Sequence, residues 1–305
     1  MSPLEVGAGW QAAGHAVALA TVVETWGSAP VPAGAHLVVR DDGAFEGSVS
    51  GGCVEAQVIE VARALLRGGP PRLLELGVDD ACAQGVGLPC GGTIRVFVGP
   101  LGDPAPLLRA RAARRSVVSV TRLDSGARVV REEASARHTP QLEGDRLIQP
   151  HAPPLRLVLV GASHVAQALC EMAVLLDLEV TVVDPRAAWL TETRFPRARR
   201  VVDWPGPETL ALDAHAGLVA LSHDPKIDDP ALAHALGTDA LYLGALGSRR
   251  SHEARLGRLR AEGWDEAALA RIHGPVGLPL GARTPAEIAL SILAELVRVQ
   301  RATYS

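Results

Sequence analysis

"LRLVLVGASHVAQALCEMAVLLDL", residues 155–178, decides the fold. It opens on an almost continuous apolar run, which is typical of a strand buried on both faces of a parallel sheet. Gly161 follows, and apolar residues then recur with helical spacing from His164 onward. The stretch therefore predicts a strand, a glycine turn and a helix, which together open a doubly wound, Rossmann-like parallel sheet.

The turn after this strand follows the dinucleotide fingerprint, with one departure. Gly161 occupies the first glycine position, and Ser163 stands where a second glycine would let backbone approach a pyrophosphate. Asp184 falls about 20 residues later, where it would bond a ribose hydroxyl, and Arg186 would instead meet a 2′-phosphate. The alternative is a Rossmann-like scaffold without a dinucleotide. The candidate anion or nucleotide residues are Gly161, Ser163, His164 and Asp184.

Composition changes near a proline-rich segment, "QPHAPPLR" (149–156). Before it, valine-rich runs broken by glycine and proline predict strands and hairpins, with a helix starting near Cys53. After it, strands alternate with helices. We therefore expect a β-rich α+β domain over residues 1–150 and a Rossmann-like α/β domain over residues 151–305.

Bulk properties exclude several classes of function. The 305 residues carry a net charge of −4, which gives no basic footprint for nucleic acid. No apolar run reaches the roughly 18 residues that a membrane span needs, and the first residues lack a signal-peptide pattern. We therefore expect a cytoplasmic protein whose cysteines are reduced.

Two cysteines of the N-terminal half lie beside paired glycines. A thiol at a helix N-terminus feels the positive end of the helix dipole, which favours the thiolate. The adjacent amides suit close approach of a ligand. The alternative is that each cysteine is a small buried hydrophobe. The candidate residues are Gly51, Gly52, Cys53, Cys90, Gly91 and Gly92.

Polar loops follow two expected strands of the C-terminal half. Ligands of open α/β sheets bind outside the carboxyl ends of strands, so these loops are candidates for a ligand site. Lys226 is the only lysine among 30 basic residues, which suggests that arginine would not serve there. The alternative is that Asp228 and Asp229 neutralise it on a solvated loop. The candidate residues are His223, Asp224, Lys226, Ser248, Arg249 and Arg250.

Several motifs in order along both halves resemble the XdhC/CoxI family of accessory and maturation factors for xanthine dehydrogenase and carbon monoxide dehydrogenase. They are "GSVSGGCVE", "GLPCGG", "VLVGASHVAQAL", "VTVVDPR", "LSHDPKIDDPAL", "YLGALGSRRSHEARL" and "IHGPVGLPLGARTPAEIALSILAE". The resemblance implies a protein that holds molybdenum cofactor (molybdopterin). It also implies help in delivering the sulfurated cofactor to a molybdenum hydroxylase, with a cysteine desulfurase supplying sulfur.

The same resemblance assigns roles to residues. The family's glycine-flanked cysteines match Cys53 and Cys90, as sulfur carriers or molybdenum ligands. A homodimer is the expected assembly. Two alternative functions remain open: an NAD(P)-dependent oxidoreductase that uses Gly161 and Asp184, and a sulfurtransferase with a persulfide on a cysteine.

Overall fold

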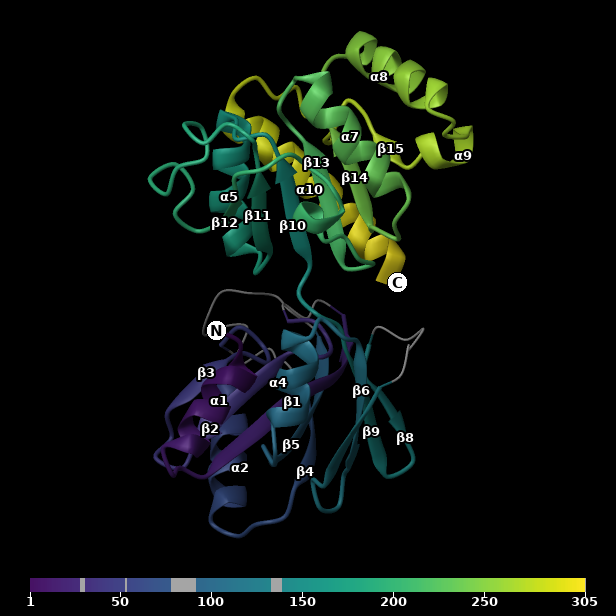
Figure 1. Cartoon of the computed structure of the whole chain (residues 1–305). Helices are drawn as coiled ribbons and strands as arrows, with labels where there is room; N and C mark the ends of the chain where they lie inside the picture. Colours follow the sequence, from purple (N-terminus) through teal and green to yellow (C-terminus); the bar gives the residue numbers. More distant parts are fainter. Residues whose placement is uncertain (28–30, 53, 78–91, 133–138, 305) are drawn as a thin grey trace. The chain divides into compact units, whose positions relative to one another are not determined.

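The computed structural model describes residues 1–27, 31–52, 54–77, 92–132 and 139–304 (Figure 1). The chain divides into two compact units, Met1–Pro153 and Pro154–Ser305. The candidate residues Cys53, Cys90 and Gly91 lie outside the described residues.

The first unit is built on an antiparallel sheet of five strands in the order β3-β2-β1-β5-β4. The central strand pairs with β2 on one side and β5 on the other, and its first seven residues are buried. This burial matches its run of valine, alanine and leucine. The strands are β1 (Val17–Trp26), β2 (His36–Arg40), β3 (Phe45–Gly47), β4 (Arg72–Gly77) and β5 (Thr93–Pro100).

Helix α2 (Glu55–Leu66) covers one face of this sheet. Val58 and Ala62, one turn apart, are fully buried in the core that the helix shares with the sheet. The helix ends before Gly68, whose φ of 101° suits glycine. Two further helices of the unit, which the sequence reading did not predict, are α1 (Pro3–Ala12) and α4 (Ala105–Ala112).

A second antiparallel sheet of the first unit has the strand order β7-β6-β9-β8. Gly126, with a φ of 71°, lies in the turn between β6 and β7, as the sequence "DSG" predicts. The strands are β6 (Val117–Arg122), β7 (Arg128–Arg131), β8 (Gln141–Glu143) and β9 (Arg146–His151).

The second unit contains a parallel sheet of six strands in the order β12-β11-β10-β13-β14-β15. The chain fills one side of β10 first and then returns to build the other side from β13, which is the Rossmann order. The predicted α/β fold class is therefore confirmed. The strands are β10 (Arg156–Val160), β11 (Glu179–Val183), β12 (Arg199–Val201), β13 (Ala216–Ala220), β14 (Tyr242–Ala245) and β15 (Ile272–His273).

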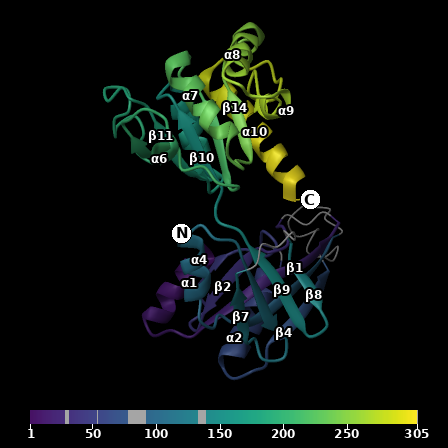
Figure 2. The same cartoon turned by 45° about the vertical axis from the view of Figure 1, so that its right-hand side comes forward.

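Helices cover both faces of the parallel sheet (Figures 1 and 2). Leu159 packs into a core with α5 and α10, while Val158 and Val160 pack on the other face with α7. This alternation explains why β10 reads as an unbroken apolar run. The helices are α5 (His164–Leu175), α6 (Pro207–Leu210), α7 (Pro225–Leu236), α8 (Arg249–Ala261), α9 (Glu266–Leu269) and α10 (Pro285–Tyr304).

Within the described residues, no helix has both the length and the apolar character that a membrane crossing requires.

Candidate functional site

Gly161 lies where the strand order reverses, between β10 and β13. Its φ is 102°, and a Cβ atom at this position would stand 2.6 Å from the backbone N and Cα of Ser222. Any other residue would combine a strained backbone with a clash against backbone. Glycine therefore allows the carboxyl ends of the two strands to approach each other at the switch point, where open α/β sheets bind their ligands.

Ser163 caps the helix that follows this turn. Its Oγ accepts a hydrogen bond from the N–H of Ala166 at 3.2 Å, and its backbone is extended. Ser163, which replaces the second glycine of the fingerprint, therefore binds one of the N–H groups that the N-terminus of α5 would otherwise leave without a partner. His164 is the first residue of α5 and is exposed.

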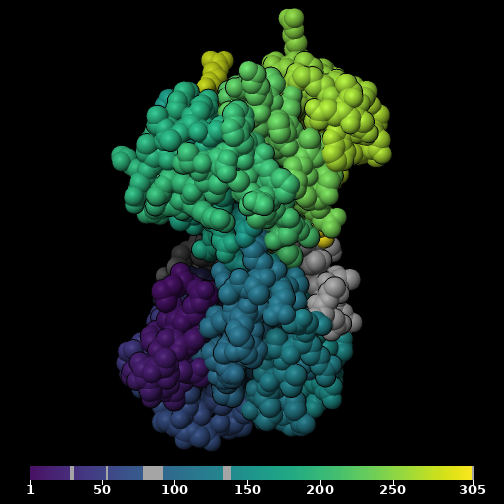
Figure 3. All heavy atoms as spheres, viewed as in Figure 1, coloured from purple at the N-terminus to yellow at the C-terminus, as the bar shows by residue number. Residues whose placement is uncertain are grey.

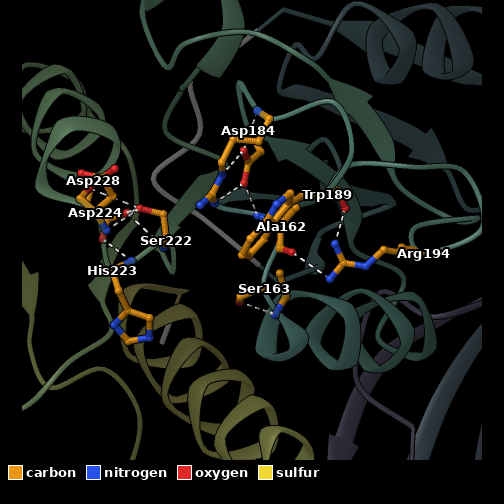
Figure 4. Close-up of polar contacts among 11 residues, drawn as sticks. Ala162, Ser163, Asp184, Trp189, Arg194, Ser222, His223, Asp224 and Asp228 are labelled. Carbon is orange, nitrogen blue, oxygen red and sulfur yellow. Dashed lines mark hydrogen bonds and ion pairs between the residues drawn. The ribbon is translucent and has the colours of Figure 1, made fainter.

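Asp184 lies at the end of β11, and its side chain is fully buried. It accepts hydrogen bonds from the Ala162 N–H at 2.7 Å and from the backbone N, Nε and Nη2 of Arg186 at 2.7–2.8 Å (Figure 4). Burial would raise the pKa of Asp184, but the hydrogen bonds from Arg186 and Ala162 hold it below its usual value. The Asp184 carboxylate was expected to accept a hydrogen bond from a ribose hydroxyl. Both of its oxygens already accept hydrogen bonds from protein groups.

Arg186 and Arg194 fix the segment after β11. The Arg186 guanidinium lies 4.2 Å from the centre of the half-exposed Trp189 ring. Arg194 donates through Nη2 to the Ala162 carbonyl at 3.0 Å and through Nη1 to the Trp189 carbonyl (Figure 4). Arg186, the residue considered for binding a 2′-phosphate, therefore already interacts with Asp184 and Trp189.

The loop after β13 turns around Asp228. This buried carboxylate accepts from the Ser222 Oγ at 2.7 Å and N–H at 3.2 Å, and from the His223 N–H at 3.1 Å. Burial raises the pKa of Asp228 in spite of these bonds. His223 has a φ of 62°, and Asp224 caps α7 by accepting from the Lys226 N–H at 3.0 Å.

Arg255 lines a cavity of about 260 Å³ beside this loop, together with His223 and Asp228. It is only 5% exposed, and its Nε and Nη1 have no hydrogen-bond partner within the described residues. Its Nη2 donates to the Leu246 carbonyl and lies 3.7 Å from Asp228 Oδ2. Its Nε also lies 3.8 Å from Asp229 Oδ1, so Nη1 is the donor that an oxyanion could use. Sequence reasoning missed this residue, because nothing in its local pattern distinguishes it from a surface arginine on a helix.

Exposed cations lie on the first turns of the helices that follow β13 and β14. Ser248 caps α8 by accepting from the Ser251 N–H at 3.1 Å, and Arg249 and Arg250 come directly after it. Their helix, α8, lies at the surface of the second unit, in the yellow-green part of Figure 3. Within the described ranges, no acidic side chain pairs with Arg249, Arg250 or Lys226.

The considered partners of Lys226 are engaged elsewhere. Asp229 forms a two-point ion pair with Arg258 and lies 3.8 Å from Arg255 Nε. Asp228 binds the Ser222–His223 turn. Lys226 is therefore an exposed, unneutralised cation in the described structure.

A glycine loop in the first unit, residues 48–52, wraps around the carboxylate of Glu55. Its backbone amides of Val49, Ser50, Gly51 and Gly52 donate to Glu55 at 2.8–3.1 Å, and the hydroxyls of Ser48 and Ser50 donate as well. Burial opposes ionisation, but these bonds lower the pKa of Glu55 from 4.5 to about 2. The Gly51 and Gly52 N–H groups thus hold a carboxylate of the protein itself.

The same loop anchors both sides of position 53. Gly52 is held by Glu55, and the Val54 N–H donates to the Ser50 Oγ at 3.0 Å. Helix α2 begins at Glu55, two residues after the cysteine, rather than at it. Glu55 itself was missed by sequence reasoning, because the convergence of the loop amides on its carboxylate depends on how the loop folds back. Gly92 is buried and directly precedes β5.

The described residues thus combine a Rossmann-type switch point flanked by exposed cations with a glycine loop anchored on a carboxylate, one in each unit. Residues 10–77 match the family described as XdhC and CoxI, and residues 157–296 match the XdhC Rossmann domain. The chain belongs to the XdhC/CoxI family.

Individual relatives agree with this membership. The chain is 32% identical over 289 residues to the molybdenum cofactor insertion chaperone PaoD of Escherichia coli (strain K12), covering 94% of this chain and 84% of PaoD. It is 26% identical to a probable xanthine dehydrogenase subunit of Bacillus subtilis (strain 168), covering 93% of each. A crystal structure described as a xanthine dehydrogenase from Bacillus halodurans superposes with a TM-score of 0.79 at 25% identity, covering 99% of this chain and 96% of that one.

Proposed function

We propose that this protein binds molybdenum cofactor and assists its sulfuration and its insertion into a molybdenum hydroxylase of the xanthine dehydrogenase or carbon monoxide dehydrogenase type. The observation that carries the proposal is the similarity along 94% of the chain to a protein named as a molybdenum cofactor insertion chaperone. The relative named as a probable xanthine dehydrogenase subunit supports the class of client.

The carboxyl edge of the parallel sheet suits the phosphate of this cofactor. Lys226, Arg249 and Arg250 are exposed and lie on helix first turns, where the dipole also favours an anion. The Nη1 of Arg255, which has no hydrogen-bond partner within the described residues, is available to an oxyanion in the neighbouring cavity. We infer that these groups bind the phosphate, with His223, Asp224 and Ser248 shaping the loops that carry them.

Cys53 is the proposed thiol of the first unit, and Cys90 is the second candidate. Molybdopterin supplies a soft, dithiolene-bound metal when it is present, and a thiolate is a matching soft ligand. The two neighbours of Cys53 in the chain, Gly52 and Val54, both donate backbone hydrogen bonds, to Glu55 and to the Ser50 hydroxyl. As a sulfur carrier, the Cys53 thiolate would attack the outer sulfur of a desulfurase persulfide. The sulfur–sulfur bond of that persulfide breaks, a Cys53 persulfide forms, and the desulfurase leaves as a thiolate.

A cysteine desulfurase partner and a homodimer belong to this proposal. A nicotinamide-dependent oxidoreductase is not favoured. Asp184, which would bind the ribose, already accepts from Ala162 and Arg186 and is fully buried. A nucleotide at the second unit stays a prediction of the sequence.

The test is a binding titration of the full chain with molybdopterin under anaerobic conditions. Wild type is expected to bind. Cys53→Ala and Cys90→Ala are expected to bind more weakly or to lose the added sulfur that intact-mass spectrometry detects after incubation with a desulfurase and cysteine. Cys170→Ala is the matched control, because Cys170 is buried in α5, where burial raises the pKa of its thiol to about 12. No binding by wild type would refute the proposal.

A further inference from the structure

His223 has a strained backbone at the switch point of the second unit. Its φ of 62° lies in the left-handed region, which is unfavourable for a residue with a side chain. Within the described ranges, the other non-glycine residues with a positive φ each lie at the C-terminus of a helix, where a left-handed residue commonly ends the helix; they are Arg114, Asp177 and Ala211. His223 lies instead between β13 and α7, so no helix end explains its conformation.

Asp228 holds His223 in this conformation. Its Oδ2 accepts from the His223 N–H at 3.1 Å, and its Oδ1 accepts from the Ser222 Oγ at 2.7 Å. The imidazole is exposed, points away from the Asp228 carboxylate (Figure 4), and makes no hydrogen bond within the described residues. Glycine would adopt the same φ without strain. The histidine side chain therefore costs stability and makes no hydrogen bond that offsets the cost, and strain of this kind is typical of binding and catalytic sites.

A second unfavourable feature lines the same cavity as His223. Arg255 is only 5% exposed and lines this cavity of about 260 Å³. Its Nη2 donates to the Leu246 carbonyl at 3.2 Å and its Nε lies 3.8 Å from Asp229 Oδ1, whereas Nη1 has no hydrogen-bond partner within the described residues. A buried donor without an acceptor lowers stability, and an acceptor atom in the cavity would remove that cost. Two separate costs therefore meet at one cavity.

The size and charge of this cavity indicate which group it can hold. Its volume lies below the roughly 300–1,000 Å³ of sites for larger ligands, so it suits a single tetrahedral group better than a fused ring system. Its charged lining residues, apart from His223, are Arg255, Arg258 and Asp228. Both oxygens of Asp228 already accept hydrogen bonds from the turn that contains His223, and Oδ2 also lies 3.7 Å from Arg255 Nη2. Two guanidinium groups beside one occupied carboxylate favour an oxyanion.

We propose that this cavity binds a tetrahedral oxyanion through the Arg255 guanidinium and the His223 side chain. The oxyanion supplies the acceptor that Arg255 Nη1 lacks, and the contact with the imidazole explains why a histidine rather than a glycine occupies the strained position. Where the oxyanion is the phosphate of molybdopterin, the inference rests on the proposed function and deepens it, because His223 then binds the ligand itself. A free oxyanion such as inorganic phosphate shares this chemistry and would be a separate ligand.

The experiment combines thermal melts of the full chain with titrations by two probes, inorganic phosphate and molybdopterin. His223→Gly relieves the strain and removes the imidazole. Its melting temperature without ligand should therefore rise by about 2–4 °C. Its affinity for each probe that wild type binds should fall about tenfold, which corresponds to the loss of one hydrogen bond. Arg255→Lys keeps a positive charge beside Asp228 and Asp229 but removes the Nη1 donor, and it should weaken binding by a similar factor.

Asp177→Gly is the matched control, because Asp177 is exposed, has a φ of 55° and follows the C-terminal end of α5. It should raise the melting temperature similarly and leave both affinities unchanged.

The outcomes separate this inference from the proposed function. Phosphate binding without molybdopterin binding, weakened in His223→Gly, supports a free oxyanion and refutes the cofactor proposal alone. Molybdopterin binding that His223→Gly leaves unchanged refutes this inference alone. Binding of neither probe by wild type overturns both. A His223→Gly variant that melts below wild type also overturns the inference, because the histidine would then stabilise the turn.

Discussion

Glu55 determines the conformation of the glycine loop that carries the proposed thiol. Four backbone amides and two hydroxyls converge on its carboxylate, so the loop is organised from the helix side rather than by a ligand. Sequence reasoning treated the Gly51 and Gly52 amides as available for an anion. Their partner could not be read from the sequence, because the convergence of six donors depends on how the loop folds back.

Replacing Glu55 should destabilise the first unit. Glu55→Ala leaves the buried donors of the loop without an acceptor, and we expect a loss of about 3 kcal/mol in the free energy of unfolding. Glu60→Ala, on an exposed position of the same helix, should change that free energy by less than about 0.5 kcal/mol. Urea unfolding measures both variants. Equal midpoints for the two would contradict the assigned role of Glu55.

The Glu55 carboxylate also predicts a pH dependence. Its pKa is lowered from 4.5 to about 2 in the folded protein, so its contribution to stability is complete above pH 4.5 and is lost as pH falls toward 2. Glu55→Gln should therefore show a shallower loss of stability across this interval than wild type does. Thermal melts between pH 2 and 5 would test this, and parallel curves would count against it.

Gly161 has a comparable structural role in the second unit, where it lets two strand ends approach each other. Gly161→Ala introduces a Cβ atom at 2.6 Å from Ser222 backbone at a φ of 102°, so we expect a loss of about 3 kcal/mol in unfolding free energy. Gly257→Ala is the control, since Gly257 lies within α8 with open space around it. That change should be neutral or stabilise by about 0.5–1 kcal/mol. A Gly161→Ala variant as stable as wild type would show that the two strand ends need not approach so closely.

The first turns of helices α7 and α8 carry positive charges that do not contribute to stability through ion pairs. Their exposed cations have no ion-pair partner in the described structure, whereas Asp229 is held by Arg258 and Asp228 by the Ser222 turn. Helix ends that keep cations free at the carboxyl edge of a sheet are suited to binding rather than to packing.

The pair Arg249→Ala and Arg250→Ala tests this separation of roles. The double variant should keep its melting temperature within about 2 °C of wild type, because surface substitutions cost little. Its affinity for molybdopterin should fall at least about tenfold if both guanidinium groups contact the phosphate. Arg260→Ala, at the other end of α8 and paired with Glu266, is the control. Unchanged affinity in the double variant would move the phosphate away from α8.

At the scale of the whole molecule, the sequence predicted the second unit well because its signals are local. The apolar run of β10, the glycine turn and the alternation of strands with helices all follow from residues adjacent in the chain. The first unit was predicted only as β-rich, and its division into two antiparallel sheets depends on pairings between distant strands. Asp184 and Arg186 show the same limit: each was considered a ligand-binding residue, yet they bind each other.

Delivery of the bound cofactor to a client hydroxylase is the step that separates an insertion chaperone from a protein that only binds the cofactor. Purified protein loaded with sulfurated molybdopterin is mixed with the cofactor-free form of a xanthine dehydrogenase-type hydroxylase, and the recovered hydroxylase activity is followed over time. Activity should appear faster and to a higher level than with the same amount of free cofactor, and Cys53→Ala should reduce it. Equal recovery with and without the protein would contradict the account.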